Sequence, residues 1–296
     1  MNDIHTLKDL TRVKRVVLDS VKKNGWSVMN ADDEYSMRII NDLPSQVAIF
    51  SLDENNEYIK KFAKEGRTTC VYEEGFVTIK KGDWKIRIGK AKDFPITMEG
   101  KAKFMIANVL AASLACYLYG FGIEDISNSL RTFIPSAQLT PGRLNVFKFK
   151  NFKVLIDFAH NPAGYEAIED YLKNVESTKK IGIISGVGDR RDEDIKLCGK
   201  IAGRMFDYII IRNEKHLRGR TEDEINGLII DGINQSGREV SYEIIPKEIE
   251  ALKHAMSMAE DGMFITALSD VLTNAIELVQ DYQHREMLDD EMNSKL

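Results

Sequence analysis

A carboxylate, an imidazole and a side-chain amide follow one another at the end of an apolar run. Asp157, His160 and Asn161 come directly after the apolar residues 154–156, and Pro162 can open the next helix. Asp157 could accept a hydrogen bond from a ribose hydroxyl, while His160 and Asn161 offer directional contacts near a helix N-terminus, where phosphate is favoured. A well-capped turn with a polar surface explains the same spacing. The pattern alone therefore leaves both interpretations open.

A second candidate is the segment 186–192, Gly-Val-Gly-Asp-Arg-Arg-Asp, which follows an apolar run and opens a helix. Two glycines at this spacing are a weak signal by themselves. Their backbone N–H groups, together with Asp189, Arg190 and Arg191, could face a phosphate or a substrate carboxylate. Asp192 is expected to cap the helix. Weaker candidates for an acidic substrate, which a solvated basic face explains more simply, are three further arginines, Arg212, Arg218 and Arg220.

Lys14 falls on the apolar side of a predicted helix. Leu7, Leu10, Val17 and Val21 recur at three- and four-residue steps, and Lys14 shares their stripe. A lysine there is unfavourable unless its ammonium reaches water or its chemistry changes. An ordinary lysine whose ammonium reaches solvent from the helix edge is the alternative.

These residues can act together only if the strands and helices of the fold bring them to the same edge of a sheet. After Pro141, helices alternate with strands expected at residues 146–149, 152–157, 180–185, 208–211, 240–245 and 263–267. Such alternation predicts a mostly parallel sheet covered on both faces, with ligands at the carboxyl ends of its strands. Before Pro141 we expect helices and two early strands, then three antiparallel strands turning at Gly75 and Gly82.

Composition narrows the class of protein. A net charge of −5 gives no basic field to attract nucleic acid, and the longest apolar run, 109–119, is too short to cross a membrane. Three cysteines without metal spacing favour reduced thiols and a cytoplasmic protein. The first residues show no apolar segment typical of a signal peptide.

Three motifs together resemble those of the Mur ligase family: Pro141-Gly-Arg143, Asp157-Phe-Ala-His-Asn-Pro162 and the segment 186–192. Residues 6–14, 28–33, 188–195, 209–213 and 217–220 are similar, more narrowly, to the Mur-like half of the cyanophycin synthetases. The resemblance implies an α/β chain. Its parts would be the C-terminal portion of a central ATPase domain at 1–140, a Rossmann-like, mostly parallel domain at 141–285, and a polar tail at 286–296.

The same resemblance implies roles for individual residues. Arg143 would reach the nucleotide, as would Asp157, His160 and Asn161, and Asn108 would approach the adenine. Met105 stands where the family has a first asparagine, which removes one polar contact. The family's lysine at the Lys14 position is often carbamylated and helps to hold Mg²⁺, so Lys14 is a predicted catalytic and metal-binding residue, and His160 a catalytic one. Asp189, Arg190 and Arg191 would face the substrate.

By resemblance, the chain is part of an ATP- and Mg²⁺-dependent, homo-oligomeric amide ligase that acts through an acyl phosphate. Its substrates would be arginine and an acidic poly-aspartate. The phosphate-binding pattern GxxxxGK[ST] is absent from the 296 residues. We therefore expect the chain to be inactive alone, either as a fragment of a longer protein or with a P-loop-bearing partner. A non-catalytic module, or another Mur-type peptide ligase, remains the alternative.

Overall fold

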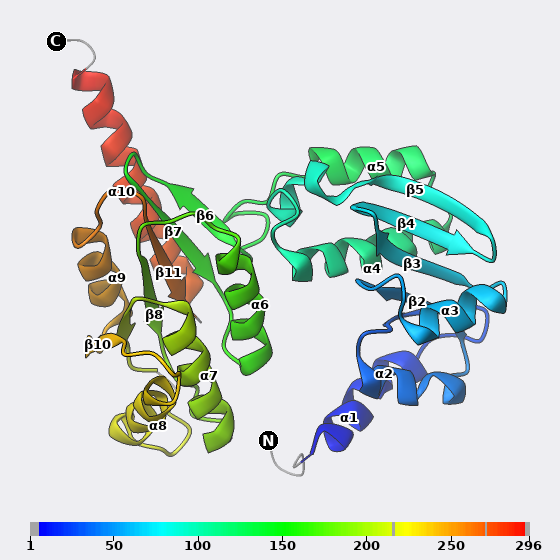
Figure 1. Cartoon of the computed structure of the whole chain (residues 1–296), viewed down its shortest axis with the longest axis horizontal. Coiled ribbons are helices and arrows are strands. Elements are labelled where there is room, and N and C mark those ends of the chain that lie inside the picture. Colours follow the sequence, from blue (N-terminus) through cyan, green and yellow to red (C-terminus); the bar gives the residue numbers. More distant parts are fainter. Residues whose placement is uncertain (1–5, 215–216, 270, 294–296) are drawn as a thin grey trace. The chain divides into compact units, whose positions relative to one another are not determined.

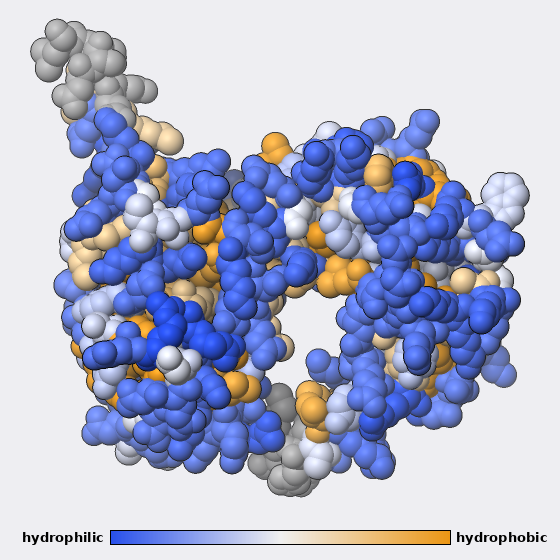
Figure 2. Space-filling model, viewed as in Figure 1, coloured by the Kyte–Doolittle hydropathy of each residue, from blue (hydrophilic) through white to orange (hydrophobic). Residues whose placement is uncertain are grey.

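The computed structural model describes residues 6–214, 217–269 and 271–293, which fold into two compact units, Met1–Ile134 and Pro135–Leu296 (Figure 1). The division falls near the predicted border at 140/141. The face of each unit seen in Figure 2 is covered mostly by hydrophilic residues. Within the described ranges, no helix combines the length and the apolar character needed to span a bilayer.

The first unit is built on a five-stranded sheet of order β1-β2-β3-β4-β5. Neighbours among the first three strands run parallel, and β4 and β5 continue antiparallel, as predicted. Gly75 and Gly82, with φ of 83° and 58°, make the two tight turns. The strands are β1 (Trp26–Asn30), β2 (Gln46–Ser51), β3 (Thr68–Glu73), β4 (Phe76–Lys81) and β5 (Trp84–Lys90).

Helices cover this sheet on both faces. On one face lies α4 (Lys103–Tyr119), whose Ile106, Leu110 and Leu114 are fully buried, with α5 (Ile123–Thr132) beside it. The other face carries α2 (Glu34–Arg38) and α3 (Glu57–Lys64), which bury Met37, Ile59 and Phe62. Because α4 is apolar almost all round, burial of that helix follows from its sequence.

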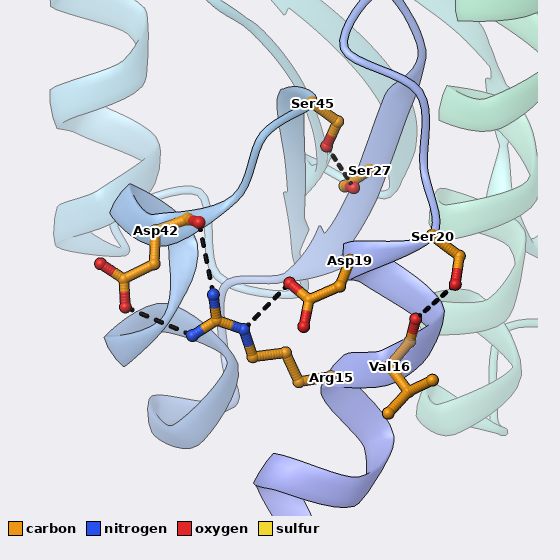
Figure 3. A network of polar contacts seen from close by, with 7 residues as sticks. All are labelled: Arg15, Val16, Asp19, Ser20, Ser27, Asp42 and Ser45. Carbon is orange, nitrogen blue, oxygen red and sulfur yellow. Dashed lines mark hydrogen bonds and ion pairs between the residues drawn. The ribbon is translucent and has the colours of Figure 1, made fainter.

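The remaining helix of this unit, α1 (Leu7–Asp19), is held by polar contacts more than by its apolar stripe. Thr6 is the N-cap of α1, and the side chains of Thr6 and Asp9 form a capping box. The Arg15 guanidinium then bridges Asp19, at 3.1 Å, and Asp42 in the 3-10 turn Ile40–Asp42 after α2, at 3.4 Å (Figure 3). No side chain of α1 is fully buried, and Val17 is 73% exposed.

The second unit contains a six-stranded sheet of order β10-β9-β8-β11-β7-β6. All neighbours are parallel except β6, which pairs antiparallel with β7, so the predicted mostly parallel sheet is confirmed. Its strands are β6 (Asn145–Lys148), β7 (Phe152–Asp157), β8 (Lys180–Ile184), β9 (Tyr208–Ile211), β10 (Ser241–Ile244) and β11 (Met263–Leu268).

Helices flank this sheet on both faces, so the described residues of the second unit form three layers (Figure 1). The helix α7 (Asp192–Met205) packs against both α6 (Pro162–Lys173) and α8 (Glu222–Asn234), whereas α9 (Glu248–Ser257) and α10 (Leu272–Asn293) share the core of β7, β8 and β11. The tail predicted to begin at residue 286 is instead helical to Asn293. Gln283 donates to the Lys148 carbonyl at 2.8 Å and Glu286 accepts from the Lys150 N–H at 3.0 Å, which ties α10 to the β6–β7 turn.

Candidate functional site

Two of the predicted motifs meet at the carboxyl edge of the second sheet. The turn after β7 and the loop after β8 line a small pocket with His160, Asn161, Ser185 and Arg190, between the N-termini of α6 and α7. Both helices direct backbone N–H groups to their N-termini, which favours an anion, whereas Asp194, which also lines the pocket and pairs with Arg191, opposes one. The structure therefore brings the motif at 157–162 together with Arg190 of the second motif.

Arg143 belongs to the same edge. Its exposed guanidinium lies over the ring of Phe158, 5.7 Å from the ring centroid. Phe158 in turn meets His160 edge-on, with centroids 4.8 Å apart, and its carbonyl lies 2.8 Å from His160 Nδ1. An Nδ1–H donating to that carbonyl leaves Nε2 of a neutral imidazole as an acceptor. Arg143, Phe158 and His160 thus form one continuous row.

Asp157 lies beneath this row. The residue is 5% exposed, and burial raises the pKa of its carboxyl group, although backbone N–H donors and the nearby Arg143 act in the opposite direction. Oδ2 accepts the Leu144 N–H at 2.8 Å and Oδ1 accepts the Ala159 N–H at 2.9 Å. The structure therefore shows the carboxylate engaged within the fold, and its predicted contact with a ribose hydroxyl stays a prediction.

Asn161 serves the helix that follows it. Its Oδ1 accepts the Gly164 N–H at 2.8 Å, which makes it the N-cap of α6, and Pro162 is the first helical residue as predicted. The turn is thus well capped, as the simpler interpretation held. The capping bond does not involve Nδ2, and Asn161 also lines the pocket, so the predicted nucleotide contact is compatible with the cap.

The second motif divides into residues inside and outside the pocket. Arg190 lines it, and its Nε is buried with no hydrogen bond to any described residue, 3.8 Å from Asp189 Oδ1. Asp189 and Arg191 are exposed, and Arg191 pairs with Asp194 of its own helix at 2.8 Å. The prediction that Asp192 caps α7 is wrong: the N-cap position belongs to Arg191, which makes no side-chain cap bond.

Gly186 and Gly188 have a packing role in this loop. Both are buried, so they do not present the exposed backbone suggested by the sequence. A Cβ on Gly188 would lie 2.2 Å from the Leu217 carbonyl oxygen, and one on Gly186 would lie 2.5 Å from Ile225. The two glycines let the β8–α7 loop pack directly against the β9–α8 region.

A buried charged cluster at the same sheet edge was missed from the sequence. Arg212 is 3% exposed, so its assignment to a solvated basic face is wrong. Its Nε lies 3.6 Å from Glu248 at the start of α9, its Nη1 lies 4.0 Å from Glu214, and Ser269 donates to Glu248. Arg212 directly follows an apolar strand, as Asp157 does, and that position is the signal that could have found it.

Two predicted residues lie in the first unit. Asn108 is exposed on α4, and its Nδ2 lies 3.6 Å from the sulfur of Met105, which is 4% exposed. Lys14 is also exposed, so the desolvation inferred from its stripe does not arise within the described residues. In the described ranges no three His, Cys, Asp or Glu side chains group as a metal site, so a carbamate at Lys14 would need other ligands to hold Mg²⁺.

Comparison with known proteins follows the division into units. The family described as "Mur ligase middle domain" matches residues 1–116, and "Mur ligase, glutamate ligase domain" matches residues 142–270. The cyanophycin synthetase of Geminocystis herdmanii is 40% identical over 282 residues, which cover 95% of this chain and 32% of that protein. That of Crocosphaera subtropica is 41% identical, with 94% and 32% covered. The chain thus spans about a third of the length of these relatives.

Solved structures share the fold at low sequence identity. The chain matches E. coli FolC in complex with DHPP and ADP with a TM-score of 0.65 and 13% identity, covering 95% of this chain and 58% of FolC. A murein peptide ligase from Psychrobacter arcticus matches with a TM-score of 0.61 and 12% identity, covering 92% and 54%. Both similarities concern the arrangement of helices and strands.

Proposed function

Because this chain belongs to the Mur ligase family, we propose that it forms the C-terminal part of an ATP-dependent amide ligase acting through an acyl phosphate. The observation that carries the proposal is the row of Arg143, Phe158 and His160 beside the pocket at the N-termini of α6 and α7. A guanidinium, an imidazole and two helix N-termini along one edge suit the phosphates of a nucleotide. In the matched FolC structure the bound nucleotide is ADP.

The chemistry has two balanced steps. A substrate carboxylate oxygen attacks the γ-phosphorus of ATP, the bond to the β-phosphate oxygen breaks, and ADP leaves. An amine nitrogen then attacks the acyl carbon, inorganic phosphate departs, and the nitrogen loses one proton. His160 is our candidate for a catalytic group of this chain, because its imidazole lines the pocket and an imidazole nitrogen can act as a general acid or base.

We further propose the substrates of the cyanophycin synthetase relatives: arginine, added to aspartate side chains of a poly-aspartate backbone. The 40% identity over 95% of this chain supports that choice over other Mur-type ligases, since a diaminopimelate ligase is only 26% identical. Asp189 and Arg191, which are exposed and flank the pocket-lining Arg190 in the sequence, are candidate contacts for the amino acid and the acidic polymer.

Mg²⁺, cytoplasmic location and homo-oligomeric assembly belong to the same proposal. Lys14 is the proposed carbamate ligand of the metal, and Asn108 the proposed adenine contact, both from the first unit. The free cysteines, Cys70, Cys116 and Cys198, agree with a reducing compartment. Because transfer of a phosphoryl group needs its charge to be held, we expect a P-loop from another segment or partner to be required.

Nucleotide binding tests the site directly. Titration of ADP into the pure chain, followed by NMR so that millimolar affinities register, should shift the amides of residues 157–162. Arg143→Ala should weaken binding on the order of tenfold, because it removes one charge-assisted contact. Arg238→Ala, at the opposite end of the sheet where Arg238 pairs with Asp207, is the matched control and should bind like the native chain. Absence of binding, or equal affinity for both variants, would refute the site.

The absence of the GxxxxGK[ST] pattern from these 296 residues favours a second candidate, a non-catalytic module of the same fold. Activity separates the two. We predict no ligase turnover by the pure chain, and ATP-dependent arginine incorporation by it alone would contradict that. Arginine-dependent ATP turnover after addition of a P-loop-bearing half would support the ligase over the module. Turnover that requires a different amino acid would point to another Mur-type ligase.

A further inference from the structure

The carboxylate of Asp157 joins two separate segments of the second unit. The antiparallel register of β6 and β7 pairs Asn145 with Ile156, so the next step along each strand sets Leu144 opposite Asp157. Oδ2 accepts the Leu144 N–H at 2.8 Å, while Oδ1 accepts the Ala159 N–H at 2.9 Å. One buried side chain thereby connects the loop before β6 to the turn after β7.

The loop it holds has an unfavourable backbone. Leu144 has a φ of 49°, a left-handed conformation in which the Cβ of an ordinary residue crowds the backbone. Gly142 is left-handed as well, with a φ of 66°, and its carbonyl accepts the Phe158 N–H at 2.9 Å. Arg143 therefore stands between two left-handed residues, and its direction depends on contacts that keep both in place.

We propose that Asp157 is a positioning residue: its carboxylate keeps Leu144 left-handed and so holds Arg143 over Phe158, in line with His160. The part of the proposal that concerns nucleotide rests on the proposed function, whereas the structural connection does not. With both oxygens accepting backbone N–H groups and 5% of the residue exposed, little of the carboxylate is left for a ribose hydroxyl. Asp157 then affects ligand binding through Arg143.

Proteolysis tests the connection without any ligand. In Asp157→Asn the amide keeps the size of the side chain, but its NH₂ group cannot accept one of the two backbone N–H groups. Trypsin should then cleave after Arg143 on the order of tenfold faster, since loss of a hydrogen bond to a charged acceptor releases the loop. Asp281→Asn, an exposed position on α10, is the matched control and should leave that rate unchanged. An unchanged rate in Asp157→Asn overturns the proposal.

The native chain supplies a test that does not depend on the variant folding. The Leu144 amide should be protected from hydrogen exchange, although it lies in a loop before a strand, because Asp157 accepts its hydrogen. The exposed Gly219 amide gives the reference for a loop. If the Leu144 amide exchanged as fast as that of Gly219, Asp157 would not hold Leu144 in place, and the proposal would be wrong.

Nucleotide analogues separate positioning from direct contact. ADP, 2′-deoxy-ADP and 3′-deoxy-ADP should all lose affinity by the same factor in Asp157→Asn, and the variant should cause no further loss in an Arg143→Ala background. A direct ribose contact predicts instead that Asp157→Asn abolishes the preference for ADP and that the two losses multiply. If the native chain binds no ADP, the proposed function fails. The trypsin result still shows whether Asp157 holds the loop that carries Arg143.

Discussion

Gly142 is a position where one added methyl group should destabilise the second unit through both the backbone and a side-chain contact. Its φ of 66° is left-handed, and an added Cβ would lie 2.4 Å and 2.6 Å from the two Cδ atoms of Leu272 at the start of α10. A left-handed alanine costs about 1–2 kcal/mol. Overpacking against a neighbour adds about 1–3 kcal/mol. We therefore expect Gly142→Ala to lower the free energy of unfolding by about 2–5 kcal/mol.

Two controls separate the causes. Gly219 has a φ of 91° with nothing within 4 Å of an added Cβ, so Gly219→Ala should show the backbone cost alone, about 1–2 kcal/mol. In a Leu272→Ala background the clash disappears, and Gly142→Ala should fall to the same value. The coupling energy between Gly142 and Leu272 in this double-mutant cycle should be about 1–3 kcal/mol.

The chain provides a convenient assay for this cycle. Both of its tryptophans, Trp26 and Trp84, lie in the first unit, so their fluorescence in urea reports that unit, while far-UV circular dichroism reports both. Gly142→Ala should move the circular dichroism transition and leave the fluorescence transition in place. Equal costs for Gly142→Ala in the native and Leu272→Ala backgrounds would show that the contact with α10 does not constrain this glycine.

Two further predictions concern charge and capping. Burial opposes ionisation of Glu73, but hydrogen bonds from Lys80 and Lys85 prevail and lower the pKa of its carboxyl group from 4.5 to about 2. The ionised group should therefore contribute up to about 3 kcal/mol to the free energy of unfolding above pH 4.5, and this contribution should be lost as the pH falls toward 2. Burial and a hydrogen bond to Glu73 raise the pKa of Glu54, which offsets part of this loss. In Glu73→Gln, the free energy of unfolding, measured in urea by tryptophan fluorescence, should fall less steeply between pH 4.5 and pH 2. An unchanged dependence on pH would contradict the role given to Glu73. Asn161→Ala should lower stability by about 1 kcal/mol by circular dichroism while Asn161→Asp retains it, and equal loss in both would exclude a capping role.

Much of the fold could be predicted because it depends on local patterns. Apolar runs of strand length, the turn glycines and the alternation after Pro141 indicate both sheets within a few residues of their observed bounds. The helix at 272–293 was predicted only in part. Its polar end has no apolar periodicity, and what fixes it is a pair of side-chain bonds from Gln283 and Glu286 to a turn more than 130 residues away, at 2.8 Å and 3.0 Å.

The sequence predicts which residues lie at the candidate site better than it predicts what each of them does there. The carboxyl end of a strand indicates Asp157 and His160 as neighbours, and the family resemblance adds Arg143, which lies over Phe158 in the same row as His160. They cannot indicate that the carboxylate turns inward, because its partner, the Leu144 N–H, is specified by the register of β6 against β7. Arg212 is missed for the same reason, since its burial depends on Glu248 from the opposite helix layer.

Asn161 and Asp157 each make a structural hydrogen bond and also lie at the candidate site. Asn161 caps α6 and lines the pocket, while Asp157 stabilises the backbone that carries Arg143. An alanine at either position removes a structural hydrogen bond together with any ligand contact, so lost binding alone cannot assign a role. Arg143 differs, because its side chain is exposed and its guanidinium makes a ring contact with Phe158 and a favourable charge interaction with Asp157. Arg143→Ala therefore reports ligand binding most directly. The effect of a buried residue on ligand affinity is best measured in a double-mutant cycle with Arg143→Ala.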